Sequence, residues 1–291
     1  MISVLNSVSQ LGAENALSST QASLQNTLLQ LSTGLKINSG SDDAAGLSIA
    51  TGLGASISAL TQSSQNASNG IGFAQTADGA LSQVTSLLNR AVTLATEAAN
   101  GGLTTAQSTA ANTEYQSILS EINTIGSTTN FNGAAVFSAG TSVFTSDGTS
   151  TGNSSVSVAP GTLTATGLGL GSGETPTVTG SGSTQTTTWS ATGNLMSASA
   201  AQGELTLITS AINTISQTRG SIGAAVNQLT AAENVENTQV TNLTSAQNNV
   251  QNADISSTVA KMTQYNVLEQ TGMAALSQSN QAQQAVLKLL Q

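Results

Sequence analysis

The strongest constraint on the fold is a stripe of apolar residues that recurs every seven positions between residues 205 and 250. A seven-residue period sustained over about six heptads keeps one stripe of a helix facing a partner helix along its whole length. At a rise of 1.5 Å per residue such a helix is roughly 70 Å long. The stripe has fourteen positions, ten of them apolar: Leu205, Ile208, Ile212, Ile215, Arg219, Ile222, Val226, Leu229, Glu233, Glu236, Val240, Leu243, Gln247 and Val250. Because a charge at a seam position costs stability unless it is paired, Arg219, Glu233 and Glu236 could fix the register of the helices. The alternative is that these long side chains extend to solvent from a loosely packed seam.

A second, Ala-rich stripe supplies the partner that such a long helix needs. It comprises Ile57, Leu60, Ser64, Ala67, Ile71, Ala74, Ala77, Leu81, Val84, Leu88, Ala91, Ala95 and Ala98. The stretch Asn100-Gly101-Gly102 ends this helix, and Tyr115, Ile118, Ile122 and Ile125 mark a third, shorter one. Three helices that share seams predict a bundle. The turn residues of Phe131-Asn132-Gly133 predict a β-hairpin after the third helix.

The two ends of the chain repeat the amphipathic theme, so each end is predicted to be one helix with a single apolar stripe. The stripes contain Leu17, Leu24, Leu28, Leu31 and Leu35 at one end, and Ile255, Val259, Met262, Met273, Leu276, Leu287 and Leu290 at the other. The opposite faces carry Ser, Thr, Asn and Gln in place of charges. We expect Ser41 or Asp42 to cap the helix that begins at Ala44.

A block rich in Ser, Thr and Gly, residues 138–193, interrupts the helical pattern and contains both prolines. Short alternating pieces such as Ser155–Val158 and Thr177–Thr179 favour a small β-rich subdomain. A disordered low-complexity linker is the alternative. Because the heptad seams lie outside the block, replacing Thr141 to Ser190 by a short linker is expected to leave assembly of the chain intact.

The composition excludes most chemistry. The chain has no His and no Cys, which are the ligands of most zinc, haem, iron–sulfur and copper sites and the usual bases and nucleophiles of enzymes. A net charge of -9 with only five Lys and Arg gives phosphate backbones little to pair with. No unbroken apolar stretch of spanning length and no signal-peptide pattern occurs. We therefore predict no enzyme, no catalytic residue, no cofactor or metal, no nucleic-acid partner and no membrane insertion.

Several motifs resemble those of bacterial flagellins. They are residues 31–50, 69–81, 129–133, 242–247, 252–255 and 282–287, including Asn69-Gly70-Ile71, Asn242-Leu243-Thr244 and Ala253-Asp254-Ile255. The resemblance covers roughly residues 1–137 and 200–291. It implies a mainly α protein: a long coiled-coil or helical-bundle rod built from both ends, with a β-hairpin and a small Ser/Thr/Gly-rich β or irregular outer domain.

The resemblance also implies domain limits and a function. Residues 1–44 with 252–291 would form a terminal coiled coil lining the filament lumen, residues 45–137 with 194–251 the rod, and 138–193 a variable, surface-exposed domain. The chain would then be a structural subunit that assembles into the flagellar filament for motility, outside the cell, after type III export without a cleavable signal. Two alternatives stay open: a hook–filament junction protein, although Ala44 stands where that protein usually has Pro, and a surface-exposed adhesive or receptor-binding protein.

Partners and contact residues follow from the same resemblance. The expected partners are other copies of the chain, the hook-associated proteins, the filament cap, a flagellin export chaperone and, as a further candidate, the vertebrate Toll-like receptor for flagellin. We expect an assembly seam that consists of Leu24, Leu28, Leu31, Leu35, Met273, Leu276, Leu287 and Leu290. Arg90, Leu94 and Glu114 match the positions at which the family contacts that receptor.

Overall fold

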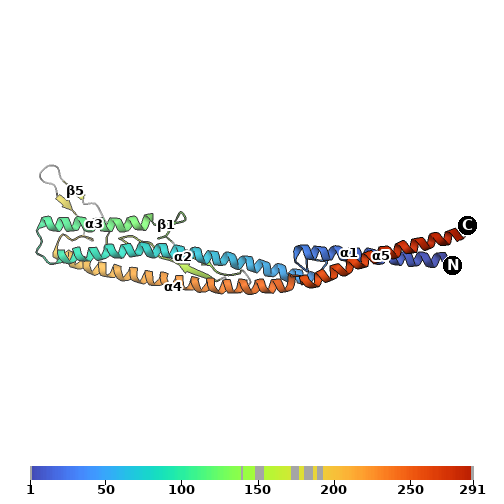
Figure 1. Cartoon of the computed structure of the whole chain (residues 1–291). Helices are drawn as coiled ribbons and strands as arrows, with labels where there is room; N and C mark the ends of the chain where they lie inside the picture. Colours follow the sequence, from blue (N-terminus) through green and yellow to red (C-terminus); the bar gives the residue numbers. More distant parts are fainter. Residues whose placement is uncertain are drawn as a thin grey trace. The chain divides into compact units, whose positions relative to one another are not determined.

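The computed structural model describes residues 2–138, 140–147, 154–171, 177–179, 186–188 and 193–289. Within this part of the chain, long helices dominate and the strands are short (Figure 1). The helices are α1 (Ile2–Thr33), α2 (Ala44–Ala99), α3 (Thr105–Thr128), α4 (Ala198–Gln251) and α5 (Ile255–Leu289). The strands β1 (Asn130–Phe131) with β2 (Ala134–Ala135), β3 (Thr141–Phe144) with β4 (Ser155–Val158), and β5 (Thr177–Thr179) with β6 (Thr186–Thr188) form antiparallel pairs. The predicted mainly α class is confirmed.

The chain divides into two compact units, Met1–Ile57 with Thr241–Gln291, and Ser58–Val240. In the first unit α1 and α5 run antiparallel, so that the two ends of the chain lie together (Figure 1). The amide Nε2 of Gln10 donates to Oδ1 of Asn280 at 2.9 Å, and Nε2 of Gln21 donates to Oε1 of Glu269 at 3.2 Å. Both predicted terminal helices are therefore present and pair with each other.

A short backbone bridge joins the two places where the helices of this unit are interrupted. Leu35 and Asn252 form an antiparallel β-bridge. The N–H of Lys36 donates to the carbonyl of Gln251 at 2.8 Å, and the N–H of Ala253 donates to the carbonyl of Gly34 at 2.9 Å. The bridge satisfies backbone groups that the helix ends leave without an intrahelical partner.

The start of α2 corrects the predicted cap. The residue that caps the helix is Asp43, whose Oδ1 accepts the N–H of Gly46 at 2.9 Å. Asp42 instead accepts the backbone N–H groups of Asn38 and Ser39 at 3.0 and 2.8 Å, and these bonds lower the pKa of its carboxyl group. The sequence pattern located the cap within two residues, but several neighbouring Ser and Asp side chains could have filled the position.

Three helices make up the second unit, with α2 antiparallel to α4 and α3 beside them (Figure 1). Along α4, every second position of the predicted seam is buried, namely Ile208, Ile215, Ile222 and Leu229. Leu205, Ile212 and Val226 are only half-buried, whereas the residues that precede them, Glu204, Ala211 and Ala225, are buried. Since α4 contacts α3 in addition to α2, its buried face is broader than a two-helix seam.

Buried polar contacts hold the chain where it returns to α4. The hydroxyl of Tyr115 donates to Oε2 of Glu204 at 2.9 Å, and the N–H of Gly193 donates to Oε1 of Glu204 at 2.7 Å. Burial and the neighbouring carboxylate raise the pKa of Tyr115. From α3, Oδ1 of Asn112 accepts the N–H of Leu195 at 2.9 Å. These side chains fix the segment that leads into α4.

Part of the Ser/Thr-rich block packs into the core of this unit. Its buried apolar side chains are those of Val143, Val158, Leu163, Ala165 and Leu170. The N–H of Ala165 donates to Oδ1 of Asn123 on α3 at 2.8 Å. A Cβ at Gly126 of α3 would lie 1.9 Å from the carbonyl oxygen of Leu163, so the segment and the helix are in direct backbone contact. The strands expected at 155–158 and 177–179 are present.

The Ser and Thr residues of the helices largely bond to their own backbone. The hydroxyl of Thr20 donates to the carbonyl of Ala16 at 2.8 Å, and that of Thr27 donates to the carbonyl of Ser23 at 2.7 Å. The same i to i−4 bond recurs in the other helices, for example from Thr85 to Leu81 on α2. Such bonds satisfy the hydroxyl proton without a partner on another element.

Candidate functional site

The surfaces most suited to function are apolar areas. Among the described residues there is no group of three or more His, Cys, Asp or Glu side chains that could hold a metal ion. The exposed large apolar side chains of the first unit are Val8, Leu11, Leu28, Leu29, Ile49, Ile255, Val259, Val267, Leu268 and Met273. These exposed apolar side chains are available for contact with another molecule.

The residues of the predicted assembly seam fall into two groups in this unit. Leu24, Leu31, Leu35 and Leu276 are half-buried. Leu28 and Met273 are 47% and 49% exposed, so the contact between α1 and α5 leaves them uncovered. For Leu287 only the helical backbone is described, and Leu290 lies outside the described residues. The pairing of the two ends within one chain therefore covers only part of their apolar surface.

The helix α2 carries a further apolar surface. By length and composition alone, α2 contains a stretch of 18 residues that is apolar enough on average to cross a membrane. Polar residues interrupt this helix, so it contains no unbroken apolar run of that length. Only 17% of the 18-residue stretch is buried in the chain. Many of its side chains are those of Ala, Gly and Ser, which permit close approach of another helix.

Two ion pairs lie on the helices of the second unit. On the seam, Nε of Arg219 lies 2.7 Å from Oδ1 of Asp78, and Nη2 lies 3.2 Å from Oδ2, so the pair is bidentate and links α4 to α2. On the outer side, Nε of Arg90 lies 2.6 Å from Oε1 of Glu114 and links α2 to α3. The hydrogen bond from Arg90 lowers the pKa of Glu114.

Of the three residues expected at a receptor contact, two are accessible. Arg90 and Glu114 are exposed and paired with each other. Leu94 is 3% exposed and packs in the core. In this conformation, a protein that binds this surface can therefore contact Arg90 and Glu114 but not the side chain of Leu94.

Replacing Arg219 by Leu tests the seam pair. The pair is partly exposed and contributes at most about 1 kcal/mol, whereas a Leu could pack against the apolar seam. We expect the thermal unfolding temperature of the monomer, followed by circular dichroism, to rise. The filaments that the flagellin-like motifs imply should become less regular, as seen by electron microscopy. Arg90→Leu, at the pair outside the seam, is the matched control. A less stable Arg219→Leu protein that builds regular filaments would show that the pair does not fix register.

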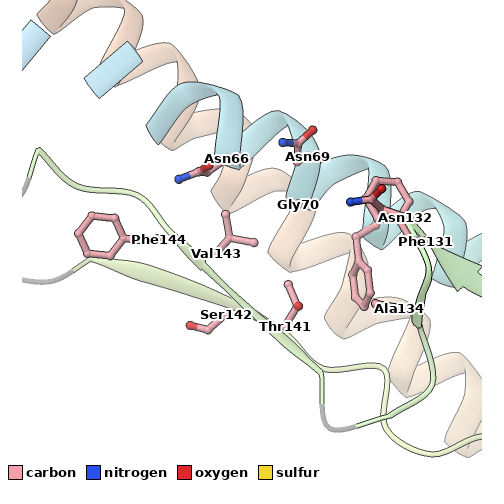
Figure 2. Close-up of a pocket in the computed structure, with 11 residues that line it drawn as sticks. Asn66, Asn69, Gly70, Phe131, Asn132, Ala134, Thr141, Ser142, Val143 and Phe144 are labelled. Atoms are coloured by element: carbon pink, nitrogen blue, oxygen red, sulfur yellow. The ribbon is translucent and has the colours of Figure 1, made fainter. Parts of the chain in front are cut away.

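A groove lies between α2 and the two hairpins that follow α3 (Figure 2). Its volume is about 860 Å³. It is lined by Asn66, Asn69, Gly70, Phe73, Phe131, Asn132, Ala134, Thr141, Ser142, Val143 and Phe144. The rings of Phe73 and Phe131 meet edge to face at 6.1 Å. The lining side chains carry aromatic, aliphatic, amide and hydroxyl groups and no charged group. Such a lining suits contact with an uncharged surface.

Two details of the sequence make this groove. Gly70 admits Val143, because a Cβ at that position would lie 2.5 Å from Cγ2 of the valine, and Figure 2 shows this valine pointing from β3 toward α2. Asn132 and Gly133 adopt positive φ angles of 51° and 80°, as a tight hairpin turn requires. The sequence predicted this turn but not the groove, since nothing in the pattern of residues 138–193 indicated that β3 lies against α2.

Comparison with known proteins identifies relatives over most of the chain. The models of the bacterial flagellin N-terminal and C-terminal helical regions match residues 4–142 and 205–290. The flagellin of Listeria monocytogenes is 30% identical over 266 residues, which cover 90% of each chain. The flagellin of Halalkalibacterium halodurans is 32% identical over 91% of each chain. The crystal structure of Bacillus cereus flagellin, at 23% identity, covers 59% of this chain and 88% of that chain with a TM-score of 0.46.

Proposed function

Because this chain belongs to the bacterial flagellin family, we propose that its paired ends and its helical bundle have separate roles in a filament built from copies of the chain. The protein is a structural subunit that self-assembles into the extracellular flagellar filament, which serves motility. The relatives reported above are all flagellins, so the filament subunit is preferred over the junction protein and the adhesive protein.

The proposed division is that residues 1–44 with 252–291 line the lumen, residues 45–137 with 194–251 form the rod, and 138–193 lie outermost. The observation that supports it is the exposed apolar stripe of the paired ends, in which Leu28 and Met273 are about half exposed. A subunit that remained a monomer would leave this stripe in water, where each half-exposed Leu or Met forgoes roughly 1 kcal/mol of further burial. Neighbouring copies would cover it.

The family also suggests the finer partners. We infer that the chain meets the hook-associated proteins and the filament cap at the two ends of the filament, and that an export chaperone binds it before type III export without a cleavable signal. For the vertebrate Toll-like receptor, the exposed Arg90 and Glu114 are the proposed contacts. Leu94, being buried, would act there through the packing of α2.

Electron microscopy of the purified full-length chain, with and without short filament fragments as seeds, tests the proposed function. We expect long filaments to grow from the seeds and the soluble protein to be depleted in a sedimentation assay. Soluble protein that stays monomeric at concentrations at which a related flagellin polymerises would refute the assembly role.

A further inference from the structure

Glu236 has a buried carboxylate group, and only one of its two oxygens has a hydrogen-bond partner. It lies at a seam position of α4 and is 4% exposed. Its Oε1 accepts the hydroxyl of Ser63 on α2 at 2.7 Å. Its Oε2 is buried and has no hydrogen-bond partner among the described residues. A buried ionised carboxylate is costly unless it is paired with a positive charge or fully hydrogen-bonded.

The basic side chains of the same unit are engaged elsewhere. Within residues 58–240 the sequence contains Arg90 and Arg219 as its only Lys or Arg residues. Arg90 pairs with Glu114, and Arg219 pairs with Asp78. Compensation of the charge of Glu236 must therefore come from something other than a basic side chain of this unit.

Glu236 lines a pocket of about 420 Å³ that is rich in oxygen-bearing side chains. Besides Glu236, the oxygen-bearing lining residues are Thr145, Ser146, Asp147, Ser154 and Gln239. The N–H of Thr145 donates to the carbonyl of Ser154 at 2.8 Å, which holds the two hairpin strands together at the rim. The volume is large enough for a cation with several water molecules.

We propose that this pocket binds one Ca²⁺ ion through the carboxylates of Glu236 and Asp147. Hydroxyl and amide oxygens of the lining, together with water, complete the coordination. Calcium suits the site because it accepts six to eight oxygen ligands in irregular geometry, whereas Mg²⁺ demands a near-ideal octahedron. Zinc and copper prefer nitrogen and sulfur ligands, and the chain contains no His and no Cys. The ion would tie the end of the β3–β4 hairpin to α4.

Calcium binding to the full-length chain tests the proposal directly. With only two carboxylates we expect a Kd of about 10⁻⁴ to 10⁻³ M, as in extracellular calcium modules. Isothermal titration should give one ion per chain. In denaturant unfolding at constant ionic strength, 10 mM CaCl₂ should raise the folded-to-unfolded ratio about tenfold or more, and MgCl₂ should raise it less.

Three variants separate this site from general attraction to an acidic protein. Glu236→Gln keeps the shape of the side chain and should abolish both the binding and the stabilisation by calcium. Asp147→Asn, at the hairpin end, should weaken binding and is the second test should Glu236→Gln fail to fold. Glu233→Gln removes a neighbouring seam carboxylate that does not line the pocket, and should bind calcium as the unaltered chain does.

Two results would overturn the proposal. One is an unaltered chain that takes up no calcium at 10 mM, because the pocket would then hold no ion. The other is binding that Glu236→Gln and Asp147→Asn leave unchanged, because the ion would then lie elsewhere.

Discussion

A fragment from Gly46 to Gln251 is expected to form no filaments at all, while remaining helical and monomeric. The fragment lacks α1 and α5, whose apolar side chains the chain itself covers only in part, as the exposure of Leu28 and Met273 shows. Helices of this kind are marginal alone, because nucleation and the loss of conformational freedom must be offset by burial against other copies. Removing them removes the surface that assembly is proposed to bury.

The measurement combines seeded growth with hydrogen exchange. The fragment should keep its helical circular dichroism spectrum and should not elongate filament seeds that the full-length chain elongates. In the full-length chain, we expect the backbone amides of Leu24 to Leu35 and of Met273 to Leu287 to exchange fast in the monomer and slowly in the filament. Growth of the fragment into filaments would show that the terminal helices are not required for assembly. Slow exchange of these amides in the monomer would show that the ends are ordered independently of assembly.

Replacing residues 141–190 by a short Gly/Ser linker is expected to lower the stability of the second unit by about 5 kcal/mol or more. The replacement removes the buried side chains of Val143, Val158, Leu163, Ala165 and Leu170. Burying one Val or Leu side chain contributes roughly 1.5–3 kcal/mol. The composition of the block predicted only that assembly stays intact, and it gave no indication of this loss of stability.

A narrower replacement provides the matched control. Substituting residues 172–192 by the same linker retains all five of these side chains and the contact of Leu163 with Gly126. We expect its urea midpoint to stay near that of the unaltered chain, and its filaments to form normally. Equal midpoints for the two replacements would mean that the packing of 141–170 on the bundle contributes little to stability.

The regular part of the fold could be predicted because a repeated period is a local property of the sequence. The seam positions Ile208, Ile215 and Leu229 were predicted from spacing alone and are fully buried. The departures arise where a third element intervenes. Glu204 takes a buried position because Tyr115 and Gly193 donate hydrogen bonds to it, and no periodicity signals that arrangement.

The candidate surfaces were predictable to a smaller extent. The spacing of leucines located the apolar stripe of the ends, yet it did not separate Leu28, which is exposed, from Leu24, which is half-buried. Which of two adjacent stripes faces the partner depends on the register of α1 against α5, which side-chain hydrogen bonds such as that from Gln10 to Asn280 help to fix. The groove beside Gly70 depends on long-range packing of β3, for which the sequence pattern gave no indication.

The Ser and Thr hydroxyl groups that bond to the backbone of their own helix affect how closely identical subunits can pack. In a filament, the same helix face lies beside identical faces of neighbouring subunits. A charge on that face would therefore lie close to the same charge on each neighbour and be repelled by it. The chain already has a net charge of -9, and its helix faces carry Ser and Thr where many soluble helices carry Lys and Glu. Because hydroxyls such as that of Thr20 already donate to the backbone of their own helix, such a face can lie against its copies without electrostatic repulsion and with few donors left unsatisfied.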